Sequence, residues 1–181
     1  MTEWSWMRIL MEGVGILGIL MNILAFQCKK HKGLVALKSA NEACFGIQYL
    51  FLGAYTGALM NAISVLRNVI FAHRVSKEKS NLFYQVLFSV IFTVLGILSW
   101  DGPKSAMVIV AKILSTVAYG IKNTATVRLL SLPSSVAWLI YNFAVGTVAG
   151  TANEAFTLGS LVLGILRLDL YPWWKKRKEA K

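Results

Sequence analysis

Hydrophobic positions dominate this chain in long runs, and polar positions gather in the short stretches between them. An α-helix needs about 20 mostly apolar residues to cross the hydrocarbon core of a bilayer. Seven runs of roughly this length follow one another, at residues 7–27, 34–53, 55–72, 81–100, 104–121, 126–145 and 148–168. The pattern therefore predicts an all-α membrane protein with seven transmembrane helices.

The chain also repeats itself at an offset of 93 positions without a gap. Aligning residues 9–74 with 102–167 gives ten identities, and Gly53 and Gly57 fall on Gly146 and Gly150. The fourth run, 81–100, has no counterpart and no charged residue. Parallel repeats of this kind are a known transporter design. We therefore expect two parallel three-helix bundles joined by a linker helix, with a first unit at 1–74, the linker at 75–100, a second unit at 101–170 and a basic tail at 171–181.

Composition and charge support a membrane location. Of the 181 residues 56% are hydrophobic, more than a soluble domain of this size buries. The formal net charge is +11. If the seven helices cross a membrane in turn, almost all of the basic residues fall in loops on the same side of it. The basic residues assigned to that side are Lys29, Lys30, Lys32, Lys38, Arg74, Lys77, Lys79, Lys122, Arg128, Lys175, Lys176, Arg177, Lys178 and Lys181. The positive-inside rule then places the N-terminus outside and the C-terminus in the cytoplasm.

The same placement argues against a nucleic-acid partner, because the basic face would lie against the bilayer. We expect the basic loops and tail to bind anionic lipid headgroups instead. His31 and His73 fall in predicted loops, and Cys28 and Cys44 fall at different depths, so neither a metal site nor a disulfide is expected. No cofactor is expected. The sequence also shows no nucleophile with a matching base, so we do not expect an enzyme.

Charged residues inside the predicted helices are the candidate chemistry. Carboxylates in hydrocarbon cost roughly 2.5–3.5 kcal/mol on insertion scales, so they usually face the interior of a bundle. At about 1.5 Å per residue, Glu42 and Arg67 come out at similar depth, and Lys112 comes within reach of Glu154. Two interpretations stay open: structural ion pairs that hold the units together, or a shared cavity in which one acid binds a cation or carries a proton.

Three other residues have alternative interpretations as well. Trp138 lies in the middle of its run, where it either packs against other helices and lipid or walls a ligand site. Asn61 either hydrogen-bonds Asn22 across helices or faces the cavity. Pro133 frees a backbone carbonyl and is a candidate hinge.

At its two glycine turns the chain resembles the SWEET, SemiSWEET and PQ-loop transporter superfamily. Over most of its length it is more similar still to the YgjV family of bacterial inner-membrane proteins. In SWEET-type second units a Trp-x-x-Tyr step precedes a pocket Asn, 16 residues after the Trp; here Trp138 and Tyr141 form the step, and Glu154 follows at that distance. In the first unit the resemblance implies pocket residues at Asn61 and Glu42, and Phe45 is the repeat counterpart of Trp138.

The departures from the pattern bear on specificity. Glu42 and Glu154 replace neutral residues of the sugar carriers, and the Pro-Gln motif is reduced to Phe26-Gln27. The resemblance implies a transporter in the bacterial inner membrane that works by alternating access. The buried acids favour a small polar or cationic solute, and proton coupling is left open. The substrate-binding residues would be Glu42, Phe45, Asn61, Trp138 and Glu154, with Arg67 and Lys112 as ion-pair or proton-relay groups. The alternatives left open are a non-transporting membrane receptor or scaffold, and a homodimer instead of a monomer.

Overall fold

The computed structural model describes residues 3–51, 55–100, 102–145 and 148–179, and these ranges are helical apart from short turns. Seven α-helices correspond to the seven predicted runs, and a π-helical segment and a last α-helix follow them. They are α1 (Glu3–Gln27), α2 (His31–Phe51), α3 (Tyr55–Ser76), α4 (Leu82–Leu98), α5 (Lys104–Tyr119), α6 (Thr124–Val145), α7 (Val148–Gly164), η1 (Ile165–Leu170) and α8 (Tyr171–Glu179).

Several helices extend beyond the predicted runs. α3 continues through His73 and Arg74 to Ser76, and cations in a last turn interact favourably with the carbonyl groups that lack partners there. α2 already begins at His31, whose Nε2 lies 2.8 Å from the Tyr119 carbonyl oxygen. The prediction that His31 lies in a loop is therefore wrong, because this contact ties it to α5. The predicted glycine turns fall partly at Gly53 and Gly146, which lie outside the described residues.

Within the described ranges, no helix has both the length and the apolar character that crossing a membrane requires.

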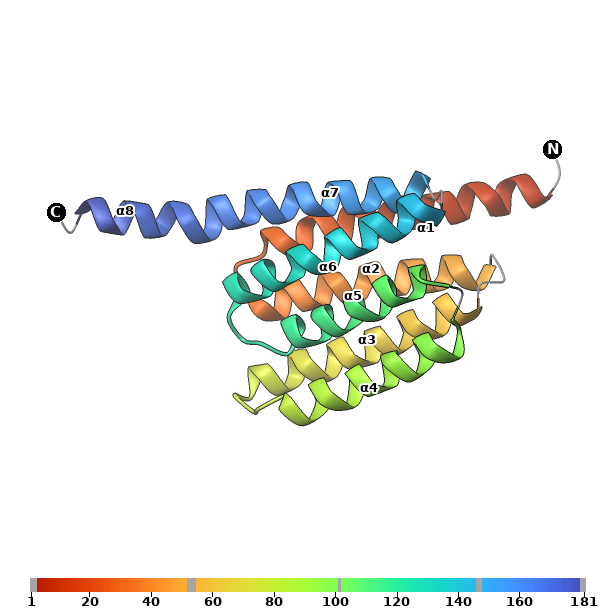
Figure 1. Ribbon diagram of the computed structural model, residues 1–181. Coiled ribbons are helices and arrows are strands. Elements are labelled where there is room, and N and C mark those ends of the chain that lie inside the picture. Colours follow the sequence, from red (N-terminus) through yellow and green to blue (C-terminus); the bar gives the residue numbers. More distant parts are fainter. Residues whose placement is uncertain (1–2, 52–54, 101, 146–147, 180–181) are drawn as a thin grey trace.

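The helices lie roughly side by side, and the chain ends at opposite ends of the bundle (Figure 1). α2 packs between α1 and α3, α6 packs between α5 and α7, and α1 packs against α7. α4 packs mainly on α5. In Figure 1, α7, η1 and α8 form one long rod that extends past the other helices. The helices α1, α2 and α3 thus pack in chain order, as do α5, α6 and α7, and α1 packs against α7.

A hydrophobic core draws one or two side chains from each of the seven main helices. Its buried members are Phe26, Leu34, Val35, Phe71, Phe88, Phe92, Ala118, Tyr119, Val127 and Leu161. Many other large apolar side chains, such as Leu17, Phe83 and Leu163, point outward and stay exposed. Polar side chains are instead numerous in the interior. This distribution sets the position of the candidate site.

A close approach of two backbones joins α7 to α1. A Cβ atom added to Gly164 would come within 2.6 Å of the Phe26 carbonyl oxygen, closer than van der Waals contact allows. Because that oxygen belongs to the backbone, only a shift of one helix would relieve the clash. Gly159, on the same helix, has nothing within 4 Å of the corresponding position.

Gly164→Ala is therefore expected to lower the free energy of unfolding by about 1–3 kcal/mol, the usual cost of overpacking. Gly159→Ala is the matched control and should raise stability by about 0.5–1 kcal/mol, because alanine is the better helix former. Thermal unfolding of the two purified variants in detergent measures the difference. Equal unfolding midpoints would contradict the close approach.

Candidate functional site

The centre of the candidate site is an ion pair between α2 and α3. The Glu42 Oε1 atom lies 3.2 Å from Arg67 Nη2, and the Asn68 side-chain amide donates to Glu42 Oε2 at 2.7 Å. Arg67 is fully buried and also donates to the Thr116 hydroxyl on α5 at 2.9 Å. The prediction that Glu42 and Arg67 meet at one depth is confirmed. Through Thr116, the pair is also tied to α5.

Lys112 approaches the same carboxylate from α5. Its Nζ atom lies 4.0 Å from Glu42 Oε1, and it donates to Ser64 Oγ at 2.9 Å and to Asn61 Oδ1 at 3.4 Å. The sequence predicted Glu154 as its partner. Lys112 does interact electrostatically with Glu154, but Glu42 is the acid with which it forms an ion pair. Helical rise alone gives depth, and it does not show toward which neighbouring helix a flexible lysine turns.

Glu154 lies on α7 among neutral hydrogen-bond donors. The Asn153 side-chain amide donates to its Oε1 atom at 3.1 Å, and the Ser135 hydroxyl on α6 also hydrogen-bonds the carboxylate. Its residue exposure is 8%, close to the 9% of Glu42. Lys38 and Lys112 both act on it electrostatically. Both predicted acids therefore point into the bundle and belong to one charged cluster.

Lys38 is a member of this cluster that the sequence interpretation misplaced. It was assigned to the cytoplasmic basic loops, yet it lies in the second turn of α2, only 8% exposed. Its Nζ atom donates to Asn22 Oδ1 on α1 at 2.6 Å. The signal was present in the sequence, because positions 38, 42 and 45 follow one another by four and three residues and so share a helix face.

Asn22 links Lys38 to α7. Its amide donates to Thr157 Oγ1 at 2.6 Å and approaches Asn153 Oδ1 at 3.4 Å, both on α7. Of the two interpretations of Asn61, the hydrogen bond to Asn22 is not found in the structure, because Asn22 bonds residues of α7. Asn61 accepts instead from Lys112, because each asparagine has a lysine close to its own helix.

Aromatic rings surround the three buried cations. Lys112 Nζ lies 5.8 Å from the centre of the Trp138 ring and 5.5 Å from that of Phe92. Lys38 Nζ lies 5.4 Å from the centre of the Phe26 ring and 5.9 Å from that of Tyr119. Such contacts stabilise a cation by about 0.5–2 kcal/mol. Trp138 thus lies beside the cluster, and Figure 1 shows its helix, α6, next to α7.

The remaining predicted residues lie at the edge of the cluster. Phe45 is half-buried, with its ring against Gly18 on α1. Pro133 lies inside α6, which stays helical from Thr124 to Val145, and its side chain is exposed. Trp138 makes an edge-to-face contact with Tyr141 at 5.7 Å between ring centres. These three side chains are uncharged, and the Trp138 ring also faces the Lys112 ammonium.

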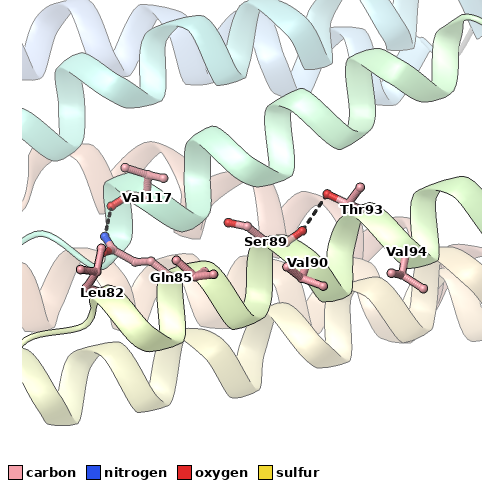
Figure 2. Close-up of a pocket in the computed structure, with 8 residues that line it drawn as sticks. Leu82, Gln85, Ser89, Val90, Thr93, Val94 and Val117 are labelled. Atoms are coloured by element: carbon pink, nitrogen blue, oxygen red, sulfur yellow. Dashed lines mark hydrogen bonds between the residues drawn. The ribbon is translucent and has the colours of Figure 1, made fainter.

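The polar interior is filled by paired side chains. Among the described residues, the buried side-chain polar atoms without a hydrogen-bond partner are His31 Nδ1 and Ser131 Oγ. An open groove of about 410 Å³ lies elsewhere, on the outer side of α4 and α5 (Figure 2). There Gln85 donates to the Val117 carbonyl and Thr93 to that of Ser89, both at 2.8 Å. With its polar atoms satisfied, this groove presents mainly valine side chains and is not the charged site.

A second buried ion pair closes one end of the bundle. Arg128 on α6 holds both carboxylate oxygens of Asp169, at 2.8 and 2.6 Å, and donates to the Cys28 carbonyl at 3.0 Å. Arg128 had also been counted among the cytoplasmic loop residues, and at 2% exposure it is buried instead. Asp169 lies in the π-helical segment. Cys28 and Cys44 are free thiols.

Metal binding finds no support in the part of the chain that the structure describes, where no three His, Cys, Asp or Glu side chains gather in a suitable group. The chemistry available at the cluster is therefore that of charges and hydrogen bonds. Six helices contribute to it, and its charged members come from α2, α3, α5 and α7.

Comparisons with known proteins agree on one family. The Imp-YgjV family model, described as "Bacterial inner membrane protein", matches residues 9–171. The chain is 26% identical over 174 residues to inner membrane protein YgjV of Escherichia coli (strain K12), covering 94% of this chain and 88% of that protein. No solved structure matches the chain.

Proposed function

Since the chain belongs to the Imp-YgjV family of bacterial inner membrane proteins, we propose that it is a membrane transporter of a small polar solute. The solute would bind in the buried charged cluster between the two three-helix units and be released by alternating access. One observation carries the proposal: charged side chains far apart in sequence, Glu42, Arg67, Lys112 and Glu154, converge in the interior. Ionisable groups inside a membrane bundle are costly and usually mark a substrate or ion pathway.

In this proposal a bilayer surrounds the seven main helices. The helices form a SWEET-like arrangement of three helices, one linker helix and three further helices. Exposed apolar side chains cover the outside while polar ones fill the inside, which suits a hydrocarbon solvent. The N-terminus would lie outside and the C-terminus in the cytoplasm. The chain ends at opposite ends of the bundle suit an odd number of crossings (Figure 1), and the distribution of basic residues sets the proposed orientation. Basic loops and α8 would then contact anionic headgroups.

Alternating access needs the two units to move against each other. Their contacts include those between α1 and α7 and the polar bonds that Asn22, Thr116 and Lys112 make. Pro133, within α6, is the proposed hinge because proline removes one backbone hydrogen bond from a helix. Glu154 is the proposed proton carrier, because the side chains that hydrogen-bond its carboxylate, Asn153 and Ser135, are neutral.

Uptake into proteoliposomes tests the proposal. Purified protein is reconstituted and screened with labelled amino acids, nucleosides, sugars, polyamines and short carboxylic acids, against protein-free vesicles. Glu154→Gln is expected to reduce uptake of the transported class about tenfold or more, because it removes a hydrogen-bonded charge worth about 1.5–3 kcal/mol. Glu78→Gln, at an exposed turn residue, is the matched control and should transport normally.

Two results would contradict the proposal. Normal uptake by a folded Glu154→Gln variant would exclude Glu154 from the pathway. Specific binding of a solute or peptide without any flux would favour the membrane receptor instead.

A further inference from the structure

The Lys38 ammonium group is buried without a carboxylate partner. Its hydrogen bonds go to Asn22 Oδ1 at 2.6 Å and to the Tyr119 hydroxyl, both neutral groups. The buried ion pairs found within 4.0 Å among the described residues join Arg67 and Lys112 to Glu42, and Arg128 to Asp169. Lys38 is in none of them. Glu154 interacts with Lys38 electrostatically, but the two do not form an ion pair within 4.0 Å. Burying an ammonium ion without a close counter-charge costs several kcal/mol.

The cluster as a whole also has fewer negative than positive charges. Among the described side chains, the cluster holds three cations, Lys38, Arg67 and Lys112, and two acids, Glu42 and Glu154. In their ordinary ionised forms these five groups sum to +1. Counting only the acids favours a cationic solute, as the sequence alone suggested. Counting Lys38 as well reverses that preference.

We propose that the cluster binds a small solute through a carboxylate group placed beside Lys38. The inference rests on the proposed function and specifies its substrate class as a monoanion. A single negative charge would neutralise the surplus, whereas a dianion such as phosphate would leave the cluster negative. The donors within reach are the Lys38 ammonium and the Asn22 amide, which face α7, where Asn153 Oδ1 accepts from Asn22.

The neighbours of Lys38 fit such a solute. The amide of Asn22 already bridges to Thr157 and Asn153 on α7, so a carboxylate at this point would contact both units at once. Phe26 and Tyr119 provide apolar ring faces for the rest of the molecule. Glu154, on the same helix as Asn153, limits the site to one added negative charge.

The test compares three molecules of the same shape and different charge. L-lactate is anionic, propane-1,2-diol is neutral and 1-amino-2-propanol is cationic at neutral pH. Each is added at the same millimolar concentration and ionic strength to the purified full chain in nanodiscs, and the unfolding temperature is recorded. Lactate alone is expected to raise the unfolding midpoint by a few degrees, with saturation, because it binds only the folded state.

Asn22→Asp separates this proposal from a structural role of Lys38. The substitution fixes a carboxylate where the Lys38 Nζ atom already lies 2.6 Å from the side-chain oxygen. Burying a new acid normally destabilises a protein. Here the variant should unfold at a higher temperature than the wild type and should no longer respond to lactate.

Lys77→Gln, at an exposed turn residue, is the control and should keep the response. Equal shifts from the three molecules, no shift from lactate, or a lower midpoint for Asn22→Asp would overturn the inference. A lactate-specific shift without flux would leave the anion site standing while transport fails. Flux of a neutral or cationic solute without a lactate response would support transport and contradict the anion site at Lys38.

Discussion

Replacement of Glu42 by alanine is expected to lower the free energy of unfolding by about 3–5 kcal/mol, because the substitution leaves a buried guanidinium without its counter-charge. Arg67 is fully buried, and Glu42 is the acid with which it pairs. Lys112 would lose the same partner, and Asn68 would lose the acceptor at 2.7 Å. Steric trapping or thermal unfolding of the purified variant in detergent measures the loss.

Two further variants separate charge from hydrogen bonding. Glu42→Gln keeps an acceptor for Asn68 but removes the negative charge, so its stability should lie between those of the alanine variant and the wild type. Glu78→Gln makes the same chemical change at an exposed acid, whose partner Lys122 is exposed as well, and should leave the unfolding midpoint unchanged. An alanine variant as stable as the wild type would show that Arg67 has another counter-charge or reaches water.

The sequence was sufficient to predict the helices and one part of the site. Hydrophobic runs located all seven main helices, because the segments are long and separated by short polar turns. The rise per residue placed Glu42 and Arg67 at one depth, and the structure pairs them. Depth along a helix is therefore readable from the sequence whenever the helix ends are known to within a turn.

The direction in which long side chains turn was not readable in the same way. Lys112 reaches three acceptors on two helices, so its choice of Glu42 over Glu154 depends on how α2, α3 and α5 pack. Lys38 was misassigned for another reason: charge counting treats any lysine near the end of a run as part of the loop. The position of Lys38 one helical turn from Glu42 was the better guide.

The difference between a cavity and a filled polar core also lies beyond sequence patterns. The spacing of Trp138 and Glu154 indicated a ligand site, and the structure brings both to one cluster. Whether polar groups pair with one another or line an open space depends on distances of about one water diameter. Such distances follow from the packing of six helices and cannot be derived from the spacing within any one of them.

The π-helical segment at Ile165–Leu170 is a further feature that the hydrophobic pattern did not predict. π-Helical turns are rare and occur often at functional sites. Here the segment carries Asp169, which Arg128 holds with two hydrogen bonds, while a third bond from Arg128 reaches the carbonyl of Cys28. One guanidinium therefore ties together α6, the end of α7 and the turn between α1 and α2.

Removal of Asp169 is expected to destabilise the chain more than removal of Arg128. Asp169→Ala leaves a guanidinium that is 2% exposed without a counter-charge, a loss of about 3–5 kcal/mol. Arg128→Met leaves a carboxylate that is 18% exposed and can still be hydrated, and the methionine fills part of the space, so its cost should be smaller. Free energies of unfolding for the two variants measure this order.

The double variant and a matched surface pair complete the test. Combining Arg128→Met with Asp169→Ala should cost less than the sum of the single changes by about 0.5–3 kcal/mol, because the second change removes a group already left without its partner. Lys122→Gln breaks the exposed pair with Glu78, where Lys122 lowers the pKa of the carboxyl through a hydrogen bond and its charge. High salt screens that exposed pair and not the buried one. Additive costs for Arg128 and Asp169, or a strong salt dependence of their coupling, would mean that the pair is solvated and does not lock this end of the bundle.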